Sequence, residues 1–408
     1  MWCLLRSYQF LYLVLFFLFI QANLSSYSLS SPTTQLCSHD EAVALIQFKN
    51  SVSVNQLYSY SSYCDYAGII SYPKTDSWKE GTDCCSWDGV TCDNIKGQVI
   101  GLDLGCSWLY GTIPSNSTLF HLPHLQKLNL AFNDFNSSKM SSKFFAGQVP
   151  SQVSHLSKLV SFDRSGNYDQ TLEQHTLEGL IVVCEENSRK TFPTRPNLKL
   201  LNLGENRNLS LNLPQLNRSR HLKFLDLSSM SFSRELFESI GNLVSLQHLD
   251  VSNAFFSGGG LPNSIGNLIS LNYLHLFNSN LSGSIPRSLG NLSQLSYLGL
   301  SENSFSGSIP SSLTNLKQLE FFYIFGNMLE GSIPNEVNAF PNLILLDLSS
   351  NLLSGTLPSW FYTIPSLKYI YLSDNQFSGY IKEFQYNSLE LIDLQNNKLQ
   401  GPIPFSIS

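Results

Sequence analysis

Leucine and asparagine recur along the chain with a fixed period. The pattern L-x-x-L-x-L-x-x-N-x-L has starts mostly 24 residues apart, at Leu198, Leu222, Leu246, Leu271, Leu295, Leu319, Leu343, Leu367 and Leu389. Upstream copies begin at Val99, Leu125 and Leu159, which makes twelve, and the region around Leu177 is a candidate for a degenerate thirteenth. A period of this length predicts stacked units, so we expect a solenoid and not separate globular domains.

The positions within one copy have distinct predicted roles. In a short strand successive side chains alternate, so Leu298 and Leu300 should face inward and Tyr297 outward. Asn303 falls where the chain must turn, and a buried amide there can bond backbone groups. The segment Gly307–Pro310 lets the backbone bend and then extend. At about 4.8 Å between strands, twelve copies give an inner sheet roughly 55 Å long, which suits a protein or peptide partner.

The first residues predict secretion. Arg6 precedes an apolar stretch, Phe10–Ile20, and small polar residues follow it. This layout is typical of a signal peptide, which we assign to residues 1–26. A membrane anchor is the alternative, but the stretch is shorter than the roughly 20 residues that span a bilayer. No later segment is long and apolar enough to cross one, so we expect a secretory-pathway protein.

Composition narrows the function classes. The 408 residues include only 13% charged residues, and the formal net charge is −6. With no basic run, the chain is not expected to bind nucleic acid through phosphate contacts. Six sequons within the repeats are predicted glycosylation sites: Asn116, Asn136, Asn208, Asn217, Asn280 and Asn291.

Cysteines cluster ahead of the repeats. Five of the seven that follow the signal peptide lie between residues 37 and 92, which indicates a disulfide-stapled module. Zinc is the competing interpretation, but Cys84, Cys85 and Cys92 do not form paired C-x-x-C knuckles. We therefore expect no metal and no cofactor.

The repeat, with S-G-x-I-P after its asparagine, resembles the plant extracellular leucine-rich repeat. The segments Cys37–Glu41, Ala44–Lys49, Ser77–Trp78 and Cys84–Cys92 are similar to the cap of that family. The additional Cys64 segment and the Leu102–Cys106 start are similar to tomato Cf-type receptor-like proteins, which confer resistance to a leaf-mould fungus.

The resemblance implies an α/β leucine-rich-repeat solenoid, a right-handed superhelix with a disulfide-bonded cap. It implies bridges Cys37–Cys84 and Cys85–Cys92, and suggests a third, Cys64–Cys106, which leaves Cys184 unpaired. We expect a cap helix from about Asp40 to Ser51, with Asp40 as the candidate N-cap. Its candidate core residues are Ala42, Leu45, Ile46 and Phe48.

The predicted organisation is a cap over residues 27–98, three copies over 99–176, an irregular segment over 177–197 and further copies over 198–408. The register fails after Leu159, where Arg164 replaces an inward leucine; an insertion and a misassigned exon or decayed gene are both open. Ser408 falls inside the last copy, and we interpret this as a fragment, a truncated product or a partial gene.

Outward strand positions are free to bind a partner. Several copies place aspartate there, but others place aromatic side chains, which are typical of interface hot spots. The candidate ligand-binding residues are Tyr273, His275, Phe277, Tyr297, Phe321, Tyr323, Phe325, Tyr369 and Tyr371. The alternative is that these rings only cover neighbouring backbone or shield sugar.

The sequence contains no catalytic motif, so no enzyme is expected. His121 and His124 flank an inter-repeat segment, and we interpret them as solvated loop residues and not as metal ligands. Asp226 and Asp250 would stand on successive strands, where surface aspartates are the better explanation than a catalytic dyad.

The resemblance implies the ectodomain of a plant immune receptor-like protein that binds an apoplastic pathogen protein or peptide. Such a protein signals through partner receptor kinases, as a single-pass type I membrane protein if the gene continues and as a secreted protein otherwise. Two alternatives stay open: a secreted inhibitor of microbial cell-wall hydrolases, similar to polygalacturonase-inhibiting proteins, and a non-functional truncated product.

Overall fold

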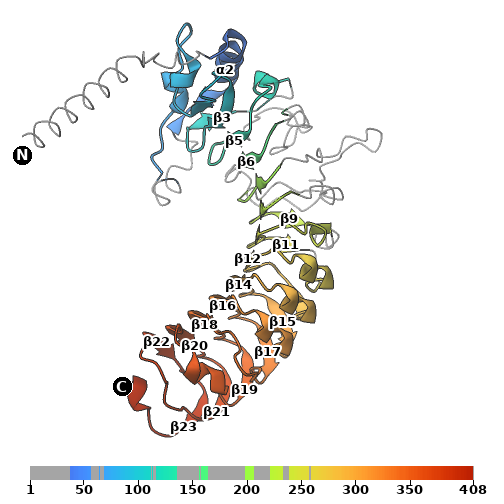
Figure 1. Cartoon of the computed structure of the whole chain (residues 1–408), viewed down its shortest axis with the longest axis vertical. Coiled ribbons are helices and arrows are strands. Elements are labelled where there is room, and N and C mark those ends of the chain that lie inside the picture. The colour runs from blue at the N-terminus through green and yellow to red at the C-terminus, as the bar shows by residue number, and fades with distance from the viewer. Residues whose placement is uncertain are drawn as a thin grey trace, which may run out of the picture.

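The structure is a computed structural model that describes residues 37–56, 64, 69–111, 113, 116–135, 156, 158–163, 198–205, 221–232, 239–256 and 259–407. The chain forms a curved solenoid with the cap at one end and the last copies at the other (Figure 1). The predicted signal peptide, Cys184, Arg164 and the segment 177–197 lie outside the described residues. Within the described part, no helix is long and apolar enough to span a bilayer.

One sheet of thirteen strands runs along the inside of the curve (Figure 1). Its strands are, in order, β2 (Val90–Cys92), β3 (Val99–Asp103), β5 (Lys127–Asn129), β6 (Ser161–Asp163), β7 (Leu200–Asn202), β8 (Phe224–Asp226), β10 (His248–Asp250), β12 (Tyr273–His275), β14 (Tyr297–Gly299), β16 (Phe321–Tyr323), β18 (Leu345–Asp347), β20 (Tyr369–Tyr371) and β22 (Leu391–Asp393). Strands β2 and β3 are antiparallel, and every later pair is parallel. The predicted solenoid is confirmed.

The strand register aligns equivalent positions of successive copies. Tyr297 pairs with Phe321 in the same way that Tyr273 pairs with Tyr297. Strand β6 pairs directly with β7, so no strand of a thirteenth copy lies between them in the sheet. Equivalent positions therefore form continuous rows across the concave face.

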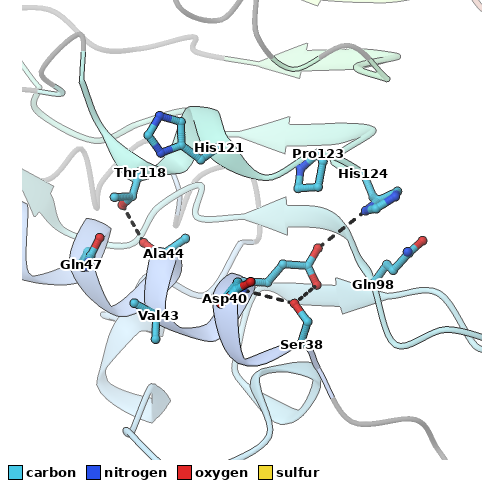
Figure 2. Close-up of a pocket in the computed structure, with 11 residues that line it drawn as sticks. Ser38, Asp40, Val43, Ala44, Gln47, Gln98, Thr118, His121, Pro123 and His124 are labelled. Carbon is cyan, nitrogen blue, oxygen red and sulfur yellow. Dashed lines mark hydrogen bonds and ion pairs between the residues drawn. The ribbon is translucent and has the colours of Figure 1, made fainter.

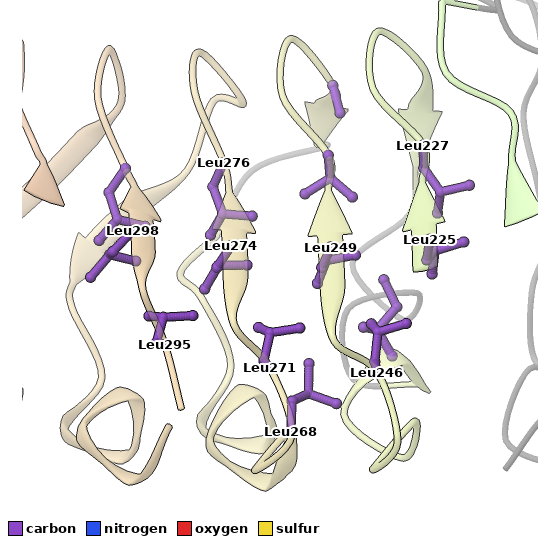
Figure 3. Packing of buried hydrophobic residues seen from close by; sticks show 14 of the residues in the cluster. Leu225, Leu227, Leu246, Leu249, Leu268, Leu271, Leu274, Leu276, Leu295 and Leu298 are labelled. Atoms are coloured by element: carbon purple, nitrogen blue, oxygen red, sulfur yellow. The ribbon is translucent and has the colours of Figure 1, made fainter. Parts of the chain in front are cut away.

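Leucine fills the space behind the sheet. Leu298 and Leu300 are fully buried, as the alternation predicts, and Leu274 and Leu276 occupy the same positions one copy earlier (Figure 3). Each copy buries its leucines against the next copy, because no copy has enough apolar surface to fold alone. The core is therefore one continuous column along the solenoid axis.

The recurrent asparagine ties each turn to its neighbours. Asn351 is 6% exposed. Its Nδ2 donates to the carbonyls of Ile324, Leu348 and Ser349 at 3.0, 3.2 and 3.1 Å, and its Oδ1 accepts from the Leu329 amide at 3.1 Å. Asn327 and Asn375 repeat this arrangement. The predicted role of the buried asparagine, which is to satisfy backbone groups at the turn, is confirmed.

A second sheet, which the sequence did not lead us to expect, lies on the other side of the core. It consists of β13 (Ser282–Ser284), β15 (Ser304–Gly307), β17 (Met328–Gly331), β19 (Leu352–Gly355), β21 (Gln376–Tyr380) and β23 (Lys398–Gln400). The shorter pairs are β11 (Phe255–Phe256) with β9 (Ser231–Phe232) and β1 (Ser53–Val54) with β4 (Leu109–Tyr110). Gly307 ends β15 with φ 74°, and Pro310 then precedes a 3-10 helix.

Short 3-10 helices complete the turns on the outside of the curve. They are η7 (Asn263–Asn267), η8 (Arg287–Asn291), η9 (Ser311–Asn315), η10 (Ser359–Thr363) and η11 (Phe405–Ile407) in the later copies, and η2 (Lys74–Ser77), η3 (Cys84–Ser86) and η4 (Thr118–His121) near the cap. Glycine allows the close approach of neighbouring turns at η8, where a Cβ on Gly290 would lie 2.3 Å from the Ser312 carbonyl oxygen.

The cap contains the predicted helix, α2 (His39–Ser51). The predicted N-cap Asp40 is wrong: Ser38 caps the helix, because its Oγ accepts from the Glu41 amide at 3.2 Å. Leu45 and Phe48 are buried as predicted, whereas Ala42 and Ile46 are partly buried against the core. Glu41 is also buried, and its carboxylate accepts from the Val99 amide at 3.2 Å. Glu41 thus connects α2 to the first repeat strand.

Three disulfides staple the cap: Cys37–Cys84, Cys85–Cys92 and Cys64–Cys106. The first two are the pairs that the family resemblance implied, and the third is the additional bridge that we suggested. Cys37, Cys84 and Cys85 lie close enough to hold a metal ion, but all three sulfurs are used in disulfide bonds. Cys106 follows strand β3, so its bridge joins the cap to the first repeat.

Candidate functional site

Four aromatic rings stack in a row on the concave face. Phe224, His248, Tyr273 and Tyr297 occupy the first position of β8, β10, β12 and β14. Their centroids are 4.1, 4.1 and 4.4 Å apart, and successive ring planes differ by 9°, 6° and 16°. We call these four residues the aromatic column. Phe224 and His248 were missed as candidates, although they occupy the same repeat position as Tyr273.

A histidine–aspartate pair stands beside the column. His275 Nδ1 lies 3.1 Å from Asp250 Oδ2, and the imidazole meets Tyr297 edge-on at 5.6 Å. Gly299 makes this arrangement possible, because a Cβ there would lie 2.7 Å from His275 Cδ2. The ring of His275 therefore covers the neighbouring strand, and its orientation is fixed by Asp250.

Further aromatic residues extend the surface toward the C-terminus. Tyr323 lies 5.5 Å from Tyr297, and Phe321 lies 6.3 Å from the same ring. Phe277 reaches Phe325 at 6.3 Å across the intervening copy. Seven of the nine candidate residues thus form one contiguous surface: Tyr273, His275, Phe277, Tyr297, Phe321, Tyr323 and Phe325.

Tyr369 and Tyr371 stand apart from this surface. Strand β18, with Leu345 and Asp347 outward, separates their strand from β16. Tyr369 donates its hydroxyl to Glu390, and no ring contact connects either tyrosine to the surface in the described part of the chain. The structure does not bring these two candidates together with the other seven.

The sequence predicted exposed rings, but the candidate rings are half-buried in the structure. They cover one another, and His275 also covers Gly299 of the neighbouring strand. Burial raises the pKa of Tyr297 to about 12 and raises that of Tyr273 still further. Both phenols are therefore neutral hydrogen-bonding groups at physiological pH.

Asp226 and Asp250 are paired directly on adjacent strands. They are more buried than the surface aspartates that we predicted, since the Asp250 side chain is only 17% exposed. Burial, and then the charge of Asp250, raise the pKa of Asp226 to about 6. Burial acts in the same direction on Asp250, but the hydrogen bond and charge of His275, with help from Ser252, hold the pKa of Asp250 below its usual value.

A separate cavity of about 540 Å³ lies where the cap meets the first repeats, between α2 and η4 (Figure 2). His121 and His124 both line it, but His124 is not the solvated residue that we predicted. Its Nδ1 is buried 3.9 Å from Glu41 Oε1 and has no hydrogen-bond partner among the described residues. Because Ser38 and Val99 already donate to the Glu41 carboxylate, we interpret this contact as part of the junction between the cap and the repeats.

Three predicted glycosylation sites lie in the described residues and away from the concave strands. Asn116, Asn280 and Asn291 are all exposed, and Asn291 ends η8 on the outside of the curve. Asn136, Asn208 and Asn217 lie outside the described residues. Glycosylation at these sequons stays a prediction.

Comparison with known families defines the class of the protein. The leucine rich repeat N-terminal domain family matches residues 38–93, and leucine rich repeats match 221–243, 245–268, 270–292, 294–316 and 341–399. These segments coincide with the cap and the later turns of the solenoid. The chain is a leucine-rich-repeat protein.

Individual relatives narrow the assignment. Receptor-like protein Cf-9 of Solanum pimpinellifolium is 38% identical over 257 residues, which is 58% of this chain and 28% of that protein. Receptor-like protein 9DC1 of the same species is 40% identical over 55% of this chain and 26% of its own length. The chain is similar to the plant leucine-rich-repeat receptor-like proteins over more than half of its length. It spans little more than a quarter of these relatives.

Solved receptor ectodomains share the fold. The Arabidopsis receptor kinase HAESA, in complex with the peptide hormone IDA and the co-receptor SERK1, superposes with a TM-score of 0.68 at 28% identity, over 89% of this chain and 54% of that one. The ectodomain of GASSHO1/SCHENGEN3, in complex with CASPARIAN STRIP INTEGRITY FACTOR 2, gives a TM-score of 0.67 at 26% identity, over 89% and 42%.

Proposed function

We propose that this chain is the ligand-binding ectodomain of a plant immune receptor-like protein, and that it binds an apoplastic pathogen protein or peptide on its concave face. The observation that carries the proposal is the contiguous aromatic surface on the outward side of the inner sheet. Half-buried rings on a rigid sheet present large contact area at a low cost in side-chain entropy, as interface hot spots do.

The proposal extends to the cellular setting. The chain enters the secretory pathway through residues 1–26, carries sugars outside the concave face and acts at the cell surface. Signalling passes to partner receptor kinases, as the relation to receptor-like proteins implies. The complexes of HAESA and GASSHO1/SCHENGEN3 with peptides support ligand binding as the general role. Recognition by a rigid surface needs no chemistry on the ligand.

The test uses two variants of the secreted full chain. The first carries His275→Ser, Phe277→Ser, Tyr323→Ser and Phe325→Ser on the concave face. The matched control carries Ile269→Ser, Met328→Ser and Leu352→Ser, which replace side chains that are 59%, 49% and 50% exposed outside the inner sheet. Each immobilised protein is incubated with apoplastic fluid from infected and from healthy leaves, and retained proteins and peptides are quantified by mass spectrometry.

We expect wild type and control to retain a component of infected fluid that the concave variant retains at least tenfold less. Thermal unfolding should shift by only a few degrees, because no fully buried leucine is replaced. Equal retention by all three proteins would contradict the binding face, and a component equally abundant in healthy fluid would contradict the pathogen origin.

A further inference from the structure

Carboxylates run beside the aromatic column. Asp163, Asp226 and Asp250 occupy the third position of β6, β8 and β10, and we call them the carboxylate row. Asn202 on β7 continues the row and donates to Asp163 Oδ2 at 3.4 Å. The column and the row lie two residues apart on each strand, which is about 7 Å. An extended side chain of a ligand can therefore reach both.

His275 is the basic side chain that contacts Asp250, at 3.1 Å, and within the described strands no lysine or arginine stands beside Asp226 and Asp250. From β6 to β22, no first or third strand position holds lysine or arginine. Strand β5, which neighbours β6 on the side of the cap, carries Lys127. Asp226 Oδ1 accepts from the amide and hydroxyl of Ser228, and the described residues supply no hydrogen bond to its Oδ2. The raised pKa of Asp226 has the same physical origin, since burial beside another carboxylate disfavours its charge.

The geometry of the column favours some ligands over others. Because His248 and Tyr273 stack on both sides at 4.1 to 4.4 Å, their ring faces are already covered. A sugar stacks on open ring faces and would find few here. The ring edges remain, beside the hydroxyls of Tyr273 and Tyr297, which hydrogen-bond each other. These edges suit an aliphatic stem that ends in a hydrogen-bond donor. Lysine and arginine side chains have this form.

We propose that the aromatic column and the carboxylate row bind a lysine- or arginine-containing peptide segment of the ligand. The aliphatic stem lies along the ring edges, and the cationic group binds Asp226 and Asp250. This inference rests on the proposed function and names the ligand chemistry of the same face. The net charge of −6 attracts a basic ligand at long range as well.

The chain offers a nearly isosteric way to remove the charges. Asn in place of Asp226 keeps an oxygen for Ser228, and Asn in place of Asp250 keeps an acceptor for His275. The matched control is Asp393→Asn, at the same repeat position on β22, where Asp393 accepts from the Gln395 amide at 3.1 Å. A lost contact between partly desolvated charges weakens binding about tenfold or more.

The probe is a phage-displayed library of random dodecapeptides, selected on the immobilised full chain. We expect wild type and Asp393→Asn to enrich lysine and arginine at least threefold over the unselected library. The double variant Asp226→Asn/Asp250→Asn should lose this enrichment and bind synthetic copies of the selected peptides at least tenfold more weakly. Raising the salt concentration should weaken the wild-type complex and leave the remaining binding of the double variant nearly constant.

The outcomes separate this inference from the proposed function. Selected peptides could bind wild type, fail to bind the variant with serine at positions 275, 277, 323 and 325, and lack basic enrichment. That result would overturn the inference and leave the proposed function standing. Failure to select any peptide on the concave face would overturn the inference and count against the proposed function. Retention of oligosaccharides on a glycan array through Tyr273, with no basic peptide enriched, would also overturn the inference.

Discussion

The buried asparagine of each repeat should be the most sensitive polar position in the solenoid. In Asn351→Ala, the Leu329 amide loses its acceptor, which is a buried donor left unsatisfied at a cost of about 1 to 3 kcal/mol. The three carbonyls that Asn351 bonds each keep another donor: Ile324 keeps Asn327, Leu348 keeps Asn375 and Ser349 keeps the Gly326 amide. Losing one of two hydrogen bonds costs each carbonyl less, so we expect Asn351→Ala to lower the free energy of unfolding by about 3 kcal/mol in total.

The variant Asn351→Asp should be worse although it has the same shape. A carboxylate oxygen would replace Nδ2 and face three carbonyl oxygens in a buried site. We expect the aspartate variant to lose at least about 2 kcal/mol more of its unfolding free energy than the alanine variant, which is the usual cost of burying such a group. Part of this loss should be recovered at acid pH, because the protonated carboxyl group can donate one hydrogen bond. The order Asp worse than Ala distinguishes this reasoning from a simple loss of volume.

The control is Asn342→Ala, directly before the copy that contains Asn351. Asn342 is exposed, and its Nδ2 donates to the Lys317 carbonyl at 2.9 Å. It should change stability by less than about 0.5 kcal/mol. Urea unfolding followed by tryptophan fluorescence gives the midpoints, and hydrogen exchange at Leu329 gives the local opening free energy. Equal midpoint shifts in Asn351→Ala and Asn342→Ala, or a well-tolerated aspartate, would refute the assignment of the asparagine as the support of the turn.

Three further predictions follow from the structure. Because the folded pKa of Asp226 is raised to about 6, the native state binds more protons than the unfolded state between about pH 4 and 6, so stability falls as pH rises through this range. The Tm of Asp226→Asn should therefore rise relative to the Tm of wild type as the pH increases. A Tm difference that does not change with pH would contradict the raised pKa of Asp226. Replacing Cys64 and Cys106 by serine opens a loop with a sequence separation of 42 residues and should lower stability by about 2 to 4 kcal/mol, measured by urea unfolding. Gly290→Ala should cost about 1 to 3 kcal/mol, because its Cβ would clash with the Ser312 carbonyl; an unchanged Tm would show that the neighbouring turns can separate.

Much of the fold followed from the sequence because each feature is local and repeats. The inward leucines and the buried asparagine each show in a single copy, and the period then multiplies the signal. The cap pairings followed from the family resemblance. The second sheet did not, because its strands pair only between copies and their residues carry no alternation strong enough to mark them. The N-cap Ser38 had a signal that was missed, since Glu41 follows it by three residues as in a capping box.

The candidate site was predictable in part. The outward aromatic residues on β12, β14 and β16 could be read from the repeat register, and the structure places them together. Phe224 and His248 were missed because their copies keep the common aspartate at the third strand position and so resemble ordinary copies. Their importance comes from ring stacking between strands, at 4.1 Å, and a single copy does not show such a contact.

The arrangement also shows that the outward positions are not independent of one another. The buried leucines and asparagines stabilise the solenoid, so the outward side chains are not needed to form the core. Yet the orientation of His275 depends on the Asp250 carboxylate at 3.1 Å and on the absence of a side chain at Gly299. The side chains that a ligand would contact therefore fix one another's positions across adjacent strands. Asp250 and Gly299 have no aromatic ring, but they determine this surface as much as the rings do.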